Sequence, residues 1–226
     1  MNRTAKIIFK EYGPTIGLAI GFALGARLFL VEAYRVAGPT MRPTLEAGDT
    51  VLITKWGFRN VERLTNSDTD GPVKHGDIIV FSSTQPSPGE YIRRVVGLPG
   101  DLVEVKKGVL YLNRASMTDV SGQSTPCTSE RTSLGKAYSV CIESPVIDDI
   151  PLLKIPDFSV MVLSDLRTSS SEFKKSKIPF IIPIDSIIGK ARWIWLSSDP
   201  DSSVAGLFPK IRFERIFSCN FLLCDR

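Results

Sequence analysis

An apolar run near the N-terminus limits most strongly what this 226-residue chain can fold into. The residues from Gly13 to Val31 are almost all apolar, and as a helix rising about 1.5 Å per residue they are long enough to cross a bilayer. Arg3, Lys6 and Lys10 precede the run, which predicts a cytoplasmic N-terminus. The sequence therefore predicts a single-pass protein of the cytoplasmic (inner) membrane, with its C-terminal domain outside the cytoplasm or in the periplasm.

Two other interpretations of this run stay open. A cleaved signal peptide has a similar charge pattern, and cleavage after Ala33 would remove the anchor. The run could also form a buried helix in a soluble core. Arg27 fits the membrane interpretation, because it lies near the outer end of the run, where its long side chain can reach the interface.

The rest of the chain has the pattern of an all-β body. Short runs rich in Val, Ile and Leu alternate with turn signals such as Pro99-Gly-Asp101. The segment Lys106-Lys-Gly108 lies between two alternating runs and predicts a hairpin. Residues 114–156 are more polar, and we expect them to be a loop-like inserted excursion. The expected strands are residues 50–54, 77–81, 91–96, 102–105, 109–112 and 160–163.

The charge and the histidine content of the chain argue against two classes of function, nucleic-acid binding and metal binding. The net charge is only +4, and Lys and Arg are scattered, without the basic stripe and interleaved aromatic residues typical of nucleic-acid binding. We therefore expect no nucleic-acid partner. His75 is the single histidine, so the chain has one imidazole that could ligate a metal ion and cannot form a His-rich site. We expect no metal and no other cofactor. We expect His75 to be exposed at the start of a strand.

The four cysteines allow several arrangements. Cys127 and Cys141 flank a polar segment; outside the cytoplasm they could form a disulfide, and inside it they would be two ordinary thiols. Cys219 and Cys224 could pair, carry a lipid or remain thiols. These alternatives stay open from the sequence.

Five segments carry motifs that occur in a defined order. They are Val36-Ala-Gly-Pro-Thr-Met-Arg-Pro-Thr-Leu45 followed by Gly48-Asp49, then His75-Gly-Asp-Ile-Ile-Val-Phe81, Tyr91-Ile-Arg-Arg-Val-Val-Gly-Leu-Pro-Gly-Asp101, Ser164-Asp-Leu-Arg167 and Lys190-Ala-Arg-Trp-Ile-Trp-Leu-Ser197. The set resembles the bacterial signal peptidase I (leader peptidase) family. That family has the patterns Ser-Met-x-Pro-Thr-Leu, Tyr-Ile-Lys-Arg-Val-Val-Gly-Leu-Pro-Gly-Asp and Gly-Asp-Asn-Arg. The resemblance runs from the expected anchor to about Phe213.

The resemblance implies a mostly β fold, a signal-peptidase-like coiled β-sheet domain with one N-terminal transmembrane helix. The division it implies is a cytoplasmic N-terminus at residues 1–12, a transmembrane anchor at 13–33, an extracytoplasmic β domain at 34–218 containing the variable excursion, and a C-terminal tail at 219–226.

In that family, a serine attacks the peptide bond after the signal peptide. A lysine that burial keeps neutral accepts the serine's proton. A backbone N–H group and a serine hydroxyl two residues before the nucleophile hold the oxyanion, and a further serine orients the lysine. These roles define a serine-type endopeptidase that needs no cofactor.

By resemblance, the catalytic roles fall on residues of other types in this chain. The nucleophile position is Thr40, the general-base position is Arg93, and the oxyanion-hole position is Gly38. Ser170 falls at the base-orienting position, in a polar run that leaves its register open by one residue. Glycine has no hydroxyl, and a guanidinium is not deprotonated in proteins. The sequence therefore leaves open whether the chain is an enzyme.

Other positions carry over as binding residues. The resemblance assigns substrate binding to Met41, Pro43, Tyr91, Asp165 and Arg167. As a cation inside a peptide-binding groove, Arg93 needs a partner, and we expect this to be Asp165 or Glu172. The residues Trp193 and Trp195 are two apart and would share one face of a strand, either in the core or at the lipid interface.

Two functions follow from these assignments. The first is signal-peptide processing of exported preproteins at the outer face of the cytoplasmic membrane, by a divergent enzyme with Thr40 as nucleophile and a recruited base such as His75 or Lys55. The second is a non-catalytic homologue, or pseudoenzyme, that binds exported peptides or assists assembly of secreted or pilus-type structures. The expected partners are signal peptides or exported preproteins, membrane lipid, and secretion or pilus assembly proteins.

Overall fold

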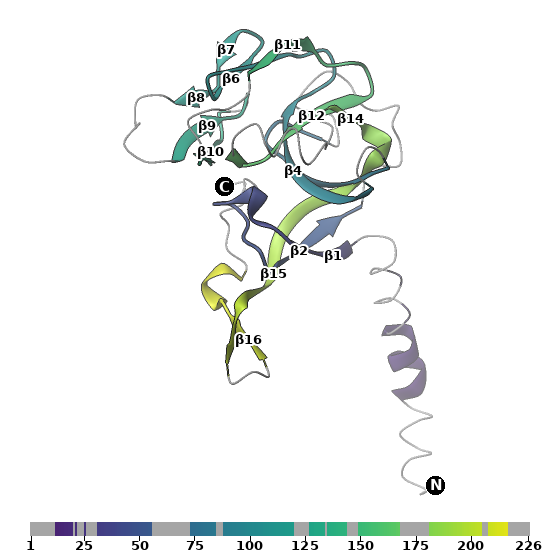
Figure 1. Cartoon of the computed structure of the whole chain (residues 1–226). Helices are drawn as coiled ribbons and strands as arrows, with labels where there is room; N and C mark the ends of the chain where they lie inside the picture. The colour runs from purple at the N-terminus through teal and green to yellow at the C-terminus, as the bar shows by residue number, and fades with distance from the viewer. Residues whose placement is uncertain are drawn as a thin grey trace, which may run out of the picture.

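The computed structural model describes residues 12–19, 21, 25, 31–55, 73–84, 88–119, 127–133, 135–143, 149–167, 181–204 and 208–216. Residues 12–19, 21 and 25 are helical, and the segment 12–19 lies apart from the β body in Figure 1. Within the described residues, no helix is both long enough and apolar enough to cross a bilayer. The predicted transmembrane helix therefore remains a prediction.

One eight-stranded sheet forms the centre of the body. Its order is β1 (Val31–Arg35), β2 (Asp49–Thr54), β15 (Ile187–Val204), β3 (Ile78–Ser83), β4 (Gly89–Gly97), β12 (Ser159–Leu163) and β14 (Ile181–Pro183), and β16 (Phe208–Ile211) pairs with β15. The neighbouring strands are antiparallel. Short 3₁₀ segments follow β1, β14 and β16; these are η1 (Pro39–Met41), η4 (Ile184–Ser186) and η5 (Phe213–Arg215).

Two four-stranded sheets lie at the end of the body opposite β16 (Figure 1). One has the order β11 (Ile150–Lys154), β5 (Leu102–Lys106), β6 (Val109–Leu112) and β7 (Ala115–Ser116). The other has the order β13 (Leu166–Arg167), β10 (Ala137–Ile142), β9 (Cys127–Arg131) and β8 (Thr118–Asp119). The described part of residues 114–156 thus contributes β7 to β11, and the loop-like character expected for this excursion was wrong. Polar side chains on the exposed faces of these strands hide the strand pattern.

Alternating side chains explain how the central strands form the core. Along β2, buried and half-buried residues alternate, and Val51 and Ile53 point to the side that also buries Met41 and Leu45. A second apolar cluster lies around β3, β4, β12 and β14, and a third lies under β5, β6 and β11. The six predicted strands are confirmed as β2, β3, β4, β5, β6 and β12, within a few residues at their ends.

The predicted hairpin at residues 106–108 is also confirmed. Lys106 pairs with Val109 across β5 and β6, so Lys107 and Gly108 form a two-residue turn. Both have positive φ, 50° and 80°, which matches the twist of antiparallel strands and favours glycine at the second position.

Three local outcomes bear on the sequence predictions. Residues 31–33, the end of the expected anchor, belong to β1 and pair with β2. Of the two positions predicted for Trp193 and Trp195, the core position was wrong, since their exposed fractions are 48% and 54%. Ile194, which lies between them in the strand, points into the core instead. Cys127 and Cys141 face each other across β9 and β10 and form a disulfide. Cys219 and Cys224 lie outside the described residues.

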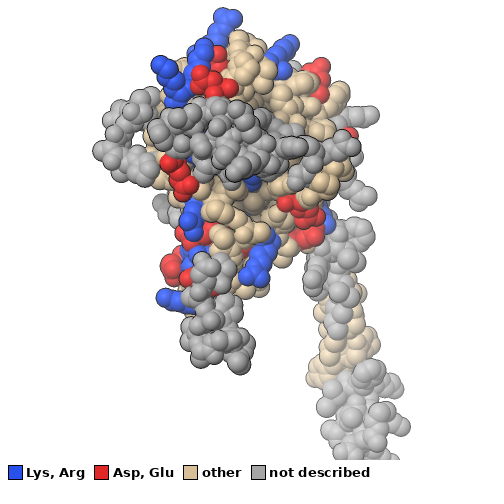
Figure 2. Space-filling model, in the orientation of Figure 1, with Lys and Arg blue, Asp and Glu red and all other residues tan. Residues whose placement is uncertain are grey.

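Charged side chains of both signs lie next to one another in Figure 2. Lys and Arg side chains neighbour Asp and Glu side chains at the top and at the lower left of the view.

Candidate functional site

Thr40 is held at the edge of the core by its neighbours. It lies in η1, which connects β1 to β2 and begins with Pro39, a residue whose fixed φ suits a helical first turn. Met41 and Leu45 are completely buried among Val51 and other core residues. Because these side chains anchor the segment, the half-buried Thr40 has a defined position at the surface.

Arg93 of β4 reaches Thr40 directly. Its Nη1 atom donates a hydrogen bond of 2.9 Å to Thr40 Oγ1 and another of 2.7 Å to the carbonyl oxygen of Ile92. The structure therefore brings together the two positions assigned to nucleophile and base, which are 53 residues apart. In this contact the hydroxyl oxygen accepts from a cation, and a guanidinium keeps its protons at any working pH.

Gly38 lies two residues before Thr40 in an extended conformation, with φ of −135°. It carries no hydroxyl that could hold an oxyanion. A Cβ atom placed on Gly38 would meet no heavy atom within 4 Å, so the position has room for a larger residue.

Asp165 pairs with Arg94, not with Arg93. Its Oδ1 and Oδ2 atoms accept from Arg94 Nε at 2.7 Å and Nη2 at 2.5 Å, and Thr44 Oγ1 donates to Oδ2 at 2.5 Å. Both side chains of the ion pair are 1% exposed. Burial by itself lowers the pKa of Arg94, but the attraction of Asp165 outweighs it and leaves that pKa raised. The expected Arg93–Asp165 pair was wrong because adjacent strand residues point to opposite faces, and Arg94 faces Asp165.

A second buried ion pair continues from the first. The Arg94 guanidinium lies 4.2 Å from the ring centroid of Tyr138, whose hydroxyl donates to Glu130 at 2.7 Å. Glu130 in turn accepts two hydrogen bonds of 2.7 Å from Arg167. Burial raises the pKa of Tyr138 well above its usual value, and the nearby Glu130 raises it further. A line of buried charges thus joins the central sheet to the β8–β9–β10–β13 sheet.

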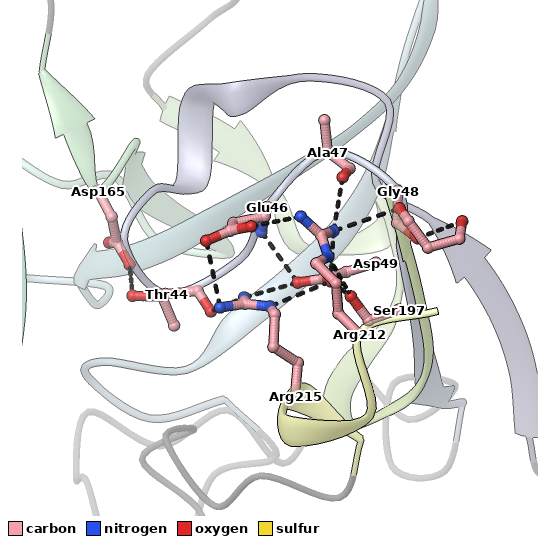
Figure 3. A network of polar contacts seen from close by, with 10 residues as sticks. Thr44, Glu46, Ala47, Gly48, Asp49, Asp165, Ser197, Arg212 and Arg215 are labelled. Atoms are coloured by element: carbon pink, nitrogen blue, oxygen red, sulfur yellow. Dashed lines mark hydrogen bonds and ion pairs between the residues drawn. The ribbon is translucent and has the colours of Figure 1, made fainter. Parts of the chain in front are cut away.

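The segment that follows Thr44 is held by two arginines from the end of the described chain (Figure 3). Arg212 contacts Glu46 at 2.5 Å and Asp49 at 3.3 Å, and Arg215 contacts Asp49 at 2.8 Å. Burial favours the neutral form of Asp49, but hydrogen bonds from Arg215, the Glu46 N–H and Ser197 outweigh it and lower its pKa. This network fixes the loop between η1 and β2.

Comparison with known proteins decides the family. The family model described as "Signal peptidase, peptidase S26" matches residues 9–196. Signal peptidase I of Pseudomonas aeruginosa is 30% identical over 217 residues, which cover 87% of this chain and 75% of that protein. This chain belongs to the signal peptidase S26 family.

Other relatives support the assignment. Signal peptidase I of Leptolyngbya laminosa is 32% identical and covers 78% of this chain and 74% of that protein. Signal peptidase I T of Bacillus subtilis is 26% identical, and the match covers 83% of this chain and 85% of that protein. A crystal structure of a signal peptidase I from Enterococcus faecalis matches 52% of this chain and 95% of that chain at 21% identity, with a TM-score of 0.32.

The positions expected to bind substrate in this signal peptidase family member differ in exposure. Pro43 is exposed and Tyr91 is half-buried against Phe81, with ring centroids 5.9 Å apart. Met41, Asp165 and Arg167 are buried, the last two in the ion pairs described above. Any effect of these three on a substrate would therefore act through the residues they support. Ser170 and Glu172 lie outside the described residues.

The two bases considered for a divergent signal peptidase are engaged elsewhere. The Lys55 Nζ atom lies 2.5 Å from Glu32. The His75 side chain is only 7% exposed, which corrects the expectation that it is exposed, and it contacts Asp101 and Ser133. Lys190 is a buried lysine whose pKa burial lowers, but its Nζ pairs with Asp77 at 2.5 Å.

Sequence reasoning missed several residues of this region. Glu130, Arg212 and Arg215 belong to buried and half-buried ion pairs, and Tyr138 donates a hydrogen bond to Glu130. The Arg93-Arg94 pair was the one available signal, since neighbouring strand residues need separate partners on opposite faces. Among the described residues, no group of three or more His, Cys, Asp and Glu side chains could hold a metal ion.

Proposed function

We propose that this signal peptidase family member binds the signal peptides of exported preproteins beside Thr40 and does not cleave them there. The observation that carries the proposal is the 2.9 Å hydrogen bond from Arg93 to the Thr40 hydroxyl. A nucleophilic hydroxyl must give its proton to a base, and an arginine can only donate.

The oxyanion position supports the same conclusion. A donor missing from an oxyanion hole costs about 100- to 1,000-fold in rate, and Gly38 supplies no side-chain donor. Loss of the base and loss of this donor act on the same reaction. Together they favour a protein that holds a peptide over one that cuts it.

Strand addition is the mode in which the peptide would bind. An extended peptide can join a sheet as a further strand and place alternate side chains in pockets. Arg93 belongs to β4, which pairs with β3 from Gly89 to Arg94 and with β12 from Arg94 to Gly97. An extended peptide next to β4 would therefore lie close to Arg93 and to Thr40, which Arg93 contacts.

The membrane geometry is part of the proposal. Residues 13–33 would form the anchor, apart from those that belong to β1, with residues 1–12 in the cytoplasm and residues 34–218 outside it. The helical segment 12–19 and β16 extend from the same end of the body in Figure 1. The exposed Trp193, Trp195 and Phe213 lie in β15 and η5, and such side chains suit a lipid interface. Secretion or pilus assembly proteins are the proposed further partners.

Signal-peptide processing with Thr40 as nucleophile is the second candidate. Membership of the signal peptidase family and the hydroxyl at the nucleophile position favour it. The same experiment separates the two functions.

The test uses the full-length protein in detergent and a preprotein with an Ala-x-Ala cleavage site. Fluorescence anisotropy of a labelled signal peptide measures binding, and mass spectrometry measures cleavage. We expect saturable binding and no cleavage, with Thr40→Ala identical to wild type in the cleavage assay. Robust cleavage that Thr40→Ala abolishes would establish the processing function instead, and absence of any binding would refute the holding function.

A further inference from the structure

Ser133, His75 and Asp101 form a hydrogen-bonded line that the proposed peptide site does not use. Ser133 Oγ lies 2.8 Å from His75 Nδ1, and His75 Nε2 lies 2.8 Å from Asp101 Oδ2. The three residues come from distant parts of the chain: the segment before β3, the turn before β5 and the turn between β9 and β10. We propose that they form a second nucleophilic site, in which Ser133 hydrolyses esters of small carboxylic acids.

Asp101 is held as the residue that orients the histidine. Besides His75, it accepts hydrogen bonds from the Leu98 N–H group and from Asn113 Nδ2, each 2.8 Å long. Burial favours its neutral form, but the hydrogen bonds from His75, Asn113 and Leu98 outweigh burial and lower the pKa of Asp101. It is therefore a carboxylate at neutral pH.

This carboxylate sets the tautomer of His75. A carboxylate only accepts hydrogen bonds, so the ring nitrogen that faces Asp101, Nε2, carries the proton. When the ring is neutral, Nδ1 carries no proton and can accept one from the Ser133 hydroxyl. The roles match those of a Ser-His-Asp triad, with the two ring nitrogens exchanged.

The burial of the three side chains fits the roles proposed for them. The side chains of His75 and Asp101 are 7% and 15% exposed, whereas Ser133 is an exposed residue. The base and its orienting group are thus shielded while the nucleophile can meet a ligand. The Ser133 turn is held by hydrogen bonds of 2.8 Å from the Thr132 N–H to the Lys136 carbonyl and from the Gly135 N–H to the Thr132 carbonyl. The disulfide between β9 and β10 ties the strands on either side of this turn.

An open hollow lies beside the nucleophile. Its volume is about 390 Å³, and Ser133, Met117, Thr132 and Arg131 are among the residues that line it. This volume is at the lower end of the range for small-molecule sites, about 300–1,000 Å³. Met117 is an apolar lining residue that suits a short acyl chain, and Arg131 brings a positive charge to the lining, which would favour an oxyanion.

The proposed reaction has two balanced steps. In the first, Ser133 Oγ attacks the ester carbonyl carbon while its proton moves to His75 Nδ1, and that proton then passes to the leaving alcohol. In the second, His75 takes a proton from water as the water attacks the acyl-serine, and returns it to Ser133 as the acid leaves. No oxidant, metal or cofactor enters either step.

The test uses the full-length protein with a fluorophosphonate probe and with p-nitrophenyl acetate and butyrate. We expect covalent labelling of Ser133, located by mass spectrometry, and ester hydrolysis that Ser133→Ala abolishes. We expect His75→Gln to lower both labelling and hydrolysis by about 100-fold or more, and Asp101→Asn to lower them less. Ser186→Ala is the matched control: it removes a serine hydroxyl that donates to the Pro183 carbonyl in another part of the chain, and it should leave both at the wild-type level.

The outcomes that overturn the proposal are specific. Wild-type protein with a folded circular dichroism spectrum and no label on Ser133 would do so, as would equal labelling of wild type and a folded His75→Gln variant. If His75→Gln does not fold, the exposed Ser133→Ala substitution still decides the hydrolysis result. Signal-peptide binding measured on Ser133→Ala keeps this proposal separate from the holding function, since we expect that binding to be unchanged.

Discussion

Arg93 Nη1 donates a 2.9 Å hydrogen bond to Thr40 Oγ1, so the two residues that we propose occupy the family's base and nucleophile positions are in direct contact. The two atoms are at hydrogen-bond distance, as in a catalytic pair, but the proton in this hydrogen bond belongs to Arg93 and not to the Thr40 hydroxyl. Under this proposal Arg93 cannot accept the proton of the Thr40 hydroxyl, because a guanidinium only donates hydrogen bonds.

Restoring the family residues should restore cleavage. We expect Gly38→Ser, Thr40→Ser and Arg93→Lys together to cleave an Ala-x-Ala preprotein, because a half-buried lysine can lose its proton and position 38 has room for a serine. The double variant without Gly38→Ser should be about 100- to 1,000-fold slower. Gel-based preprotein cleavage measures both. A folded triple variant without activity would mean that other parts of the peptide site have also changed.

Breaking the buried Asp165–Arg94 pair should destabilise the fold strongly. Asp165→Ala leaves the Arg94 guanidinium buried without its carboxylate, and we expect a loss of about 3–5 kcal/mol in the free energy of unfolding. Lys55→Ala is the matched control, because its pair with Glu32 is solvent-exposed and should contribute less than about 1 kcal/mol. Urea unfolding followed by circular dichroism measures both. Equal losses in the two variants would contradict the difference in burial.

The contribution of Arg215 should depend on pH. Because the folded-state pKa of Asp49 is lowered, its carboxylate stabilises the fold above its unfolded pKa of about 3.9, and this stabilisation is lost as pH falls through the folded value. We expect Arg215→Gln to cost about 1–3 kcal/mol at pH 7 and progressively less below pH of about 4. Urea unfolding from pH 7 to pH 3 measures the difference from wild type.

Two features make this difference interpretable. Asp101 also has a lowered pKa, but it titrates in both proteins and cancels in the comparison. Arg35→Gln, at an exposed position of β1, controls for the loss of one positive charge. A penalty for Arg215→Gln that stays constant down to pH 3 would contradict the role of Asp49.

The disulfide should stabilise the β9–β10 hairpin. Cys127 and Cys141 are 14 residues apart in sequence, and closing a loop of about 15 residues contributes about 3 kcal/mol. We expect the double variant Cys127→Ser and Cys141→Ser to lose about that amount in the free energy of unfolding. A reductant should lower the Tm of wild type and leave that of the double variant unchanged. An identical reductant effect on both proteins would contradict the assignment.

Gly189 should not tolerate a side chain. A Cβ atom there would lie 2.7 Å from the carbonyl oxygen of Thr54, a backbone atom of the neighbouring β2 strand. We expect Gly189→Ala to cost about 1–3 kcal/mol through strand displacement. Gly38→Ala, which meets no heavy atom within 4 Å, is the control and should be close to wild type. Thermal unfolding of the two variants gives the comparison.

Local sequence was enough to predict the strands, the 106–108 hairpin and the family. Strand alternation and turn residues are short-range properties, so they can be recognised without knowing what a strand packs against. The resemblance assigned Thr40 and Arg93 to one site; the structure brings the two side chains within 2.9 Å, and their roles remain a proposal. The β strands of the excursion were missed because their exposed faces are polar.

Only the tertiary structure decided which charged groups pair. Asp165 and Arg94 are 71 residues apart, and the choice between Arg93 and Arg94 depends on which face of β4 meets the loop of Asp165. His75 and Ser133 are 58 residues apart, and their contact requires β3 and the β9–β10 turn to approach each other. Sequence spacing determines the direction of a side chain within a strand, whereas a partner from another strand is determined by how the sheets pack.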